Sequence, residues 1–148
     1  MVEGKITVEE IQVDKIIEEM RKYAYKGAGA LAIFIGFVKG IVDGNTVEEL
    51  EYTAYEPYAS KKIEEIVNEE FDEEVFDIRV YHRIGRLKAG EPTIYIFVAA
   101  KTRKKAFEKA SRILERIKHE VPIFKLEKRS DGEYWVLGDG RRVRRLSK

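Results

Sequence analysis

The amino-acid sequence predicts an α+β fold with an antiparallel or mixed sheet, packed helices and a C-terminal β-hairpin. Two observations favour this class: the predicted strands form hairpin-like pairs, and the predicted helices are separate amphipathic segments. A third is size, because 148 residues with 44% hydrophobic content suffice for a buried core. We detect no internal repeat and no interdomain linker. We therefore expect one domain over residues 1–140 and a basic, mobile tail over residues 141–148.

The first half of the sequence contains the patterns of an edge strand, a helix and two longer strands. Asp14 is placed to cap the helix, and Gly27 is placed to end it. The apolar, β-branched run after Gly29 is typical of a central strand. The expected elements are, in order, Lys5–Val8, Asp14–Tyr25, Ala30–Val38 and Val47–Tyr55.

The second half predicts a helix, two strands, a second helix and a hairpin. Pro57 suits the first turn of a helix. Alternating apolar residues from Ile78 to Ile84 predict a half-buried strand. The Ser130-Asp131-Gly132 turn predicts the hairpin. The expected elements besides the helix after Lys101 are Pro57–Phe71, Ile78–Ile84, Thr93–Ala99, Phe124–Lys128 and Glu133–Val136.

Composition excludes several classes of protein. The net charge of +1 argues against general nucleic-acid binding. The chain contains no apolar run of membrane-spanning length and no signal-peptide pattern, so we expect a cytoplasmic protein. Cysteine is absent, which removes disulfides, thiolate nucleophiles and cysteine-ligated metals, and only His82 and His119 supply imidazoles. We expect no metal and no cofactor, and any sulfur chemistry requires a partner that brings the sulfur.

The stretch KTRKKAFEKASRILERIKHEVPIFKLE, residues 101–127, carries the candidate site. Thr102 is placed to be the N-cap, and three cations starting at Arg103 follow it, where helix amides favour an anion. Lys118 lies at the edge of the apolar face, and Lys125 follows a turn at Pro122. These cations are placed to converge on an anionic ligand, although solvated surface charge explains the same spacing. The apolar face comprises Ala106, Phe107, Ala110, Ile113, Leu114 and Ile117.

Four sequence blocks together resemble one protein family. KHEVPIFKLE is flanked by RKKAFEKA and DGEYWV, and GALAIFIGFVKG, EYTAYEPYA and YHRIGRLKAGE precede them. Their order and spacing are similar to those of the catalytic (large) subunit of molybdopterin synthase. The resemblance covers about Gly27 to Val136. The residues at the characteristic positions of the last blocks are Lys118, Pro122, Phe124, Lys125, Glu127 and Trp135.

The resemblance implies a fold, an activity and an assembly. The fold is the α/β-hammerhead-containing fold of the large subunit. The activity is sulfur transfer to cyclic pyranopterin monophosphate, which forms the dithiolene of molybdopterin. The sulfur arrives as a thiocarboxylate at the C-terminus of a small ubiquitin-like subunit. Two large subunits form a homodimer at the centre of a heterotetramer, with a small subunit at each end. No nucleic acid or membrane takes part.

The resemblance also assigns residues by position. Lys118 matches the catalytic lysine, and Lys125 matches a second pocket lysine with a catalytic role. A lysine partly buried near other cations has a pKa lowered from about 10.4, which suits a proton shuttle. The substrate-binding set implied by the resemblance is Lys39, Thr102, Arg103, Lys118, Lys125, Leu126 and Glu127.

Two of these positions depart from the family pattern. Lys39 stands where an arginine is typical and keeps the charge without the planar two-pronged fork. Thr102 stands where a histidine is typical and is not a base at neutral pH. Two alternatives of other classes therefore remain open: a non-catalytic module that binds a phosphate-bearing ligand or RNA, and an inactive dimeric scaffold of the same fold. His82 is interpreted as a structural histidine, and His119 as a residue that complements the helix dipole.

Overall fold

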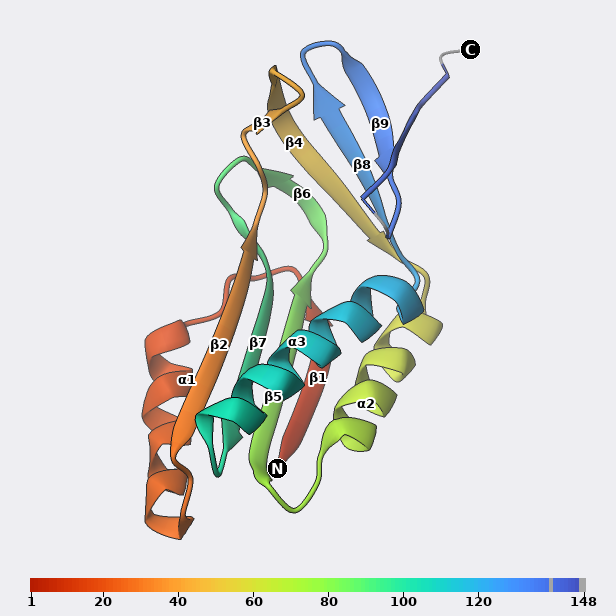
Figure 1. The fold of residues 1–148 in the computed structure, drawn as a ribbon. Helices are drawn as coiled ribbons and strands as arrows, with labels where there is room; N and C mark the ends of the chain where they lie inside the picture. Colours follow the sequence, from red (N-terminus) through yellow and green to blue (C-terminus); the bar gives the residue numbers. More distant parts are fainter. Residues whose placement is uncertain (139, 147–148) are drawn as a thin grey trace.

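The computed structural model describes residues 1–138 and 140–146, which form two sheets and the helices that pack on the first (Figure 1). The first sheet has the strand order β1-β5-β7-β2, and the second has the order β10-β9-β8-β4-β3 with β6 also paired to β4. The helical elements are α1 (Val13–Met20), η1 (Arg21–Lys26), α2 (Tyr58–Glu70) and α3 (Arg103–Glu120). The strands are β1 (Val2–Thr7), β2 (Ala30–Phe37), β3 (Ile41–Val42), β4 (Asn45–Ala54), β5 (Val75–Arg83), β6 (Gly85–Lys88), β7 (Pro92–Ala100), β8 (Ile123–Arg129), β9 (Gly132–Val136) and β10 (Arg142–Arg144).

The first sheet is covered on both faces. Helices α2 and α3 pack on one face, and α1 lies on the other (Figure 1). Met20 of α1 packs with Tyr95 and Phe97 of β7, so the second face is also apolar and buried. The prediction of a half-buried strand at Ile78–Ile84 was therefore wrong, because nearly every residue of β5 is buried. Strand β1 runs parallel to β5 and the other pairs are antiparallel, which confirms the mixed sheet of the predicted α+β class.

Three local predictions are corrected. The run from Ala30 forms β2 at an edge of its sheet, not a central strand, because no other strand of the described residues pairs with its outer side. Gln12, not Asp14, is the N-cap of α1, and no side chain caps this helix. Phe107 was expected on the buried face of α3 but is 68% exposed, because it lies outside the stripe of this helix that is buried, Ala106, Lys109, Ala110, Ile113 and Ile117. Gly27 does end the helical segment, with a left-handed φ of 109° that glycine adopts without strain.

The second sheet is built around the long strand β4, which pairs with β3, β6 and β8, and it carries the C-terminal hairpin. Strands β8 and β9 pair in antiparallel register around Asp131, which confirms the predicted hairpin. The carboxylate of Asp131 accepts hydrogen bonds from Arg129 and from the hydroxyl of Tyr134, which explains why the turn is well defined.

The segment expected to be a basic, mobile tail contains a strand. Residues Arg142–Arg144 form β10 and pair antiparallel with β9, because alternate arginines find carboxylate or carbonyl partners on the hairpin. Ser147 and Lys148, the end of the expected tail, lie outside the described residues. No helix within residues 1–138 and 140–146 is both long and apolar enough to cross a membrane.

Candidate active site

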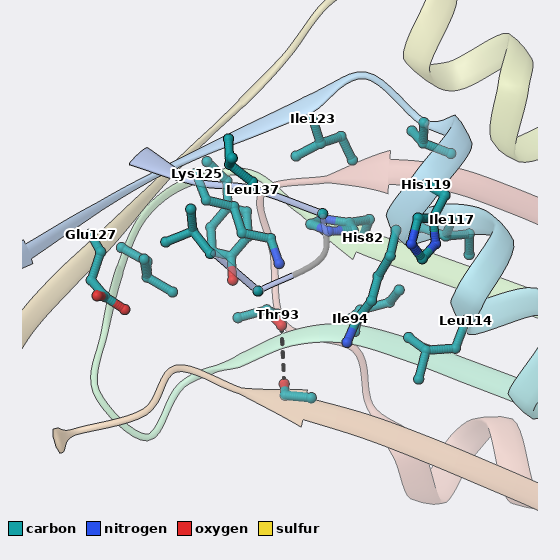
Figure 2. Close-up of a pocket in the computed structure, with 18 of the residues that line it drawn as sticks. His82, Thr93, Ile94, Leu114, Ile117, His119, Ile123, Lys125, Glu127 and Leu137 are labelled. Atoms are coloured by element: carbon teal, nitrogen blue, oxygen red, sulfur yellow. Dashed lines mark hydrogen bonds between the residues drawn. The ribbon is translucent and has the colours of Figure 1, made fainter. Parts of the chain in front are cut away.

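A cavity of about 680 Å³ lies where the two sheets and the end of α3 meet. Its volume is in the range of pockets that hold small-molecule ligands. Figure 2 shows the side chains that surround it, which come from strands of both sheets, from α3 and from the segment after β9. The cationic lining residues are Lys39, Lys118, Lys125 and Arg142.

Lys125 reaches the cavity because of strand alternation in β8. Lys125 and Glu127 line the cavity, whereas the intervening Leu126 does not line it and is only 3% exposed. The ammonium of Lys125 lies 5.7 Å from the centre of the Tyr52 ring, a cation–π arrangement. Burial, followed by the positive charges of Lys118 and Arg142, lowers the pKa of Lys125, and only Glu127 opposes this. Lys125 is thus a lysine with enhanced ability to give up its proton.

Lys118 and His119 lie in the last turn of α3, whose apolar face anchors them against the first sheet. The helix stops at Val121 because Pro122 follows. Gly138 packs closely on this end: a Cβ at Gly138 would lie 2.8 Å from the carbonyl oxygen of Lys118. The segment after β9 therefore lies directly over the helix end that presents Lys118.

Lys39 enters the cavity lining from the chain that leaves β2. The amide of Val38 donates to the carbonyl of Glu91 at 3.0 Å, and Gly90 donates to the carbonyl of Val38 at 2.9 Å. These bonds hold the residue before Lys39 against the β6–β7 turn. Three lysines from three separate chain segments thus line one cavity.

Glu127 is a buried carboxylate held by arginines. It is 2% exposed and accepts hydrogen bonds from Nε and Nη2 of Arg142 at 2.8 and 3.2 Å, with Arg129 at 3.7 Å. This two-pronged pairing ties β10 to β8 and puts Arg142 into the cavity lining. Sequence reasoning missed Arg142 because its run of basic residues resembles a solvated tail. The alternation of arginines at 142 and 144 was the available signal.

Thr102 and Arg103 do not reach this cavity within one chain. They begin α3, whereas Lys118 is near its end, fifteen residues after Arg103. At about 1.5 Å per residue the separation is about 22 Å along the helix axis. Thr102 instead caps the helix, as predicted, because its Oγ1 accepts a hydrogen bond from the Lys105 amide at 3.2 Å. Within one chain, Thr102 and Arg103 thus lie away from the cavity that Lys118 lines, and Leu126 is not among its lining residues. The substrate-binding roles expected for these three residues stay predictions.

The two histidines differ in their surroundings. His82 is buried, and its Nδ1 lies 2.7 Å from the carbonyl oxygen of Arg83, so it has the backbone partner expected of a structural histidine. It also lines the cavity, beside the ring of Tyr52. His119 is exposed, and its Nδ1 lies 2.8 Å from the carbonyl oxygen of Glu115.

The cavity therefore combines several cations with few free anions. Its carboxylates are Glu115, which is exposed to solvent, and Glu127, which is already paired with Arg142. Such a site favours an anionic ligand and stabilises negative charge that develops during a reaction. Within the described part of the chain, no group of three or more His, Cys, Asp or Glu side chains is placed to hold a metal ion.

Known proteins of one family match this chain in sequence and in fold. A family model described as the MoaE protein matches residues 6–120. The molybdopterin synthase catalytic subunit of Pyrococcus abyssi is 38% identical over 141 residues, which cover 94% of this chain and 95% of the relative. The structure of molybdopterin synthase from Staphylococcus aureus matches with a TM-score of 0.77 at 33% identity, covering 89% of this chain and 95% of that one.

A structure of more distant sequence has the same fold. It is the protein–protein complex of subunits 1 and 2 of molybdopterin-converting factor from Helicobacter pylori, matched with a TM-score of 0.70 at 21% identity over 97% of this chain and 90% of that one. Together the family model and the relatives confirm the resemblance predicted from the sequence. The chain belongs to the MoaE protein family, the family of molybdopterin synthase catalytic subunits.

Proposed function

We propose that the protein is the catalytic subunit of molybdopterin synthase. It transfers sulfur from the C-terminal thiocarboxylate of a small ubiquitin-like subunit to cyclic pyranopterin monophosphate, in molybdenum cofactor biosynthesis in the cytoplasm. The observation that carries the proposal is the convergence of Lys39, Lys118 and Lys125, from three chain segments, on one cavity. The absence of cysteine from the chain fits a reaction in which the partner supplies the sulfur.

The lysines reduce the electrostatic repulsion between the two reactants. A thiocarboxylate and a phosphate-bearing substrate are both anions, and two unit charges 4 Å apart repel by about 4 kcal/mol at an effective dielectric of 20. Cations around both groups offset this repulsion. The thiocarboxylate sulfur attacks an electrophilic carbon of the substrate and forms a C–S bond, while a C–O bond at that carbon breaks and its oxygen leaves with a proton from a lysine of the cavity. Water then cleaves the acyl–sulfur bond, which leaves the sulfur on the substrate and a carboxylate on the carrier.

Lys118 and Lys125 take different parts in these steps. Lys118, at the end of α3, stabilises the negative charge that develops on the acyl oxygen. Lys125 has a lowered pKa, closer to the working pH, and is the better proton donor. Lys39 lies at the rim, where its charge suits the substrate phosphate.

Arg103 and Thr102 act on the substrate only if a second copy of the chain presents them. Their distance from Lys118 within one chain is too large for a shared small ligand. The homodimer implied by the family resemblance provides this route, with the start of α3 of one copy at the cavity of the other. Each active site would then be incomplete in a single chain.

Reconstitution tests the function. The protein is mixed with the thiocarboxylated small subunit and cyclic pyranopterin monophosphate, and the dithiolene product is assayed. We expect product with the wild type, none with Lys118→Ala, and full activity with the control Lys61→Ala on the exposed side of α2. Normal turnover by Lys118→Ala would refute its assigned role. A folded wild type that binds the small subunit but makes no product would indicate an inactive scaffold.

Complementation between two inactive variants tests whether Arg103 of one copy acts at the cavity of the other. Lys118→Ala and Arg103→Ala homodimers should both be inactive, because each site lacks one residue. A mixed dimer of the two variants contains one cavity with both residues intact, so about half of the wild-type activity per dimer should return. If the mixed dimer stays inactive while Arg103→Ala alone is inactive, Arg103 does not act across the dimer.

A further inference from the structure

His82 is held in one orientation at the wall of the cavity. Its Nδ1 lies 2.7 Å from the carbonyl oxygen of Arg83, its own neighbour in β5. A carbonyl oxygen only accepts hydrogen bonds, so Nδ1 carries the proton. The ring is also packed edge-on against Tyr52, with ring centres 5.4 Å apart. Backbone and ring contacts together fix which nitrogen is free.

The free nitrogen is Nε2, and it carries a lone pair when the ring is neutral. No hydrogen bond among residues 1–138 and 140–146 uses Nε2. Figure 2 shows the His82 ring among the side chains that line the cavity. Burial, with a smaller effect from the charge of Lys125, lowers the pKa of His82 to about 4, against the opposing hydrogen bond to Arg83. The ring is therefore neutral at physiological pH.

Nε2 is an acceptor with a fixed direction. Lys39, Lys118 and Lys125 are hydrogen-bond donors only, and the carboxylate of Glu127 already accepts from Arg142. The hydroxyls of Tyr52 and Thr93 also line the cavity, but a hydroxyl both donates and accepts, and Thr93 donates to the carbonyl of Gly36. A phosphate or carboxylate has acceptor oxygens, so it pairs with the lysines and gains nothing from Nε2. A pterin ring, in contrast, carries N–H groups that require acceptors when they leave water.

We propose that Nε2 of His82 accepts a hydrogen bond from an N–H or O–H group of the bound ligand. His82 is thereby a specificity-determining residue for the heterocyclic part of the substrate. The lysines bind the anionic groups, and His82 recognises the ring. This inference rests on the proposed function, because it assumes that the ligand is a pterin phosphate.

Two substitutions separate this role from a structural one. His82→Asn places an amide N–H near the position of Nδ1, which keeps the bond to Arg83, and removes the acceptor at Nε2. His82→Gln places an amide oxygen near the position of Nε2, which keeps the acceptor, and loses the bond to Arg83. The dissociation constants of cyclic pyranopterin monophosphate and of inorganic phosphate are measured for the wild type and both variants, with thermal unfolding as the check on folding.

We expect His82→Asn to weaken pterin binding about 5- to 10-fold, the effect of one neutral hydrogen bond, with phosphate binding unchanged. His82→Gln should stay within about twofold of the wild type for both ligands. Unchanged pterin binding by a folded His82→Asn would overturn the proposal. If either variant folds poorly, the ¹⁵N resonance of Nε2 in the wild type decides: it should shift when pterin saturates the site, and an unchanged resonance would overturn the proposal. A wild type that binds phosphate but no pterin would instead count against the proposed function.

Discussion

The two sheets of this protein are stabilised by different interactions, apolar burial in the first and charged pairs in the second. The first sheet is buried between α1 on one face and α2 and α3 on the other, and its strands β5 and β7 are almost entirely inaccessible. The second sheet has a much smaller apolar cluster around Val42, Leu50 and Leu87. Its strands are tied by charged pairs, such as Glu127 with Arg142 and Lys128 with Glu49. Figure 1 shows this second sheet projecting beyond the helices.

The cavity lies at the junction of these regions, and each contributes a different property. The first sheet and α3 supply rigid positions, since the end of α3 is anchored through Ile113 and Ile117 in the main core. The second sheet supplies charge, through Lys125 and the paired Glu127. A catalytic cation needs both a fixed position and a neighbourhood that lowers its pKa. The junction between an apolar layer and a charged one provides both.

The largest expected effect comes from matched valine deletions in the two sheets. Val80 in β5 is fully buried in the main core, and Val42 in β3 is 7% exposed in the smaller cluster. Val80→Ala should lower the free energy of unfolding by about 3 kcal/mol, because the packed surroundings cannot collapse into the cavity. Val42→Ala should cost about 1 kcal/mol, because a two-residue edge strand relaxes easily. Urea denaturation of both variants measures this. Equal losses would remove the distinction between the two sheets.

A second prediction concerns acid stability at the junction. The pKa of His82 is about 4 in the folded protein, below the value near 6.5 of an unfolded chain. Between these values the unfolded state binds more protons, so stability falls as the pH drops through this window. At pH 5 the loss relative to pH 7 should be about 2 kcal/mol from this group. Urea denaturation at pH 5 and 7 should therefore show a smaller loss for His82→Asn than for the wild type. Equal losses would mean that His82 is not buried in its neutral form.

The sequence predicted best what local patterns determine. The N-cap at Thr102, the hairpin around Asp131 and the family itself follow from short motifs, and the structure or the comparisons confirm them. It failed where the answer depends on what packs from elsewhere. Burial of β5 on its second face requires α1, and the pairing of Arg142 requires β8. A basic run gives no sign of a buried carboxylate fifteen residues earlier in the chain, at Glu127.

The smallest expected change in stability comes from substitutions of Thr102, and these substitutions separate a structural role of this residue from a functional one. Its side chain caps α3, so Thr102→Ala should lower the free energy of unfolding by about 1 kcal/mol, whereas Thr102→Ser should be nearly neutral. If capping is its whole role, both variants keep wild-type turnover in the reconstituted reaction, because the cap lies about 24 Å from Lys118 along the helix. If a second copy presents Thr102 to the substrate, Thr102→Ala should also raise the KM for the pterin, while Thr102→Ser, which keeps the hydroxyl, should not. Chemical denaturation and steady-state kinetics on the same two variants therefore show whether Thr102 acts only as the cap of α3 or also contacts the substrate in the cavity of a second copy.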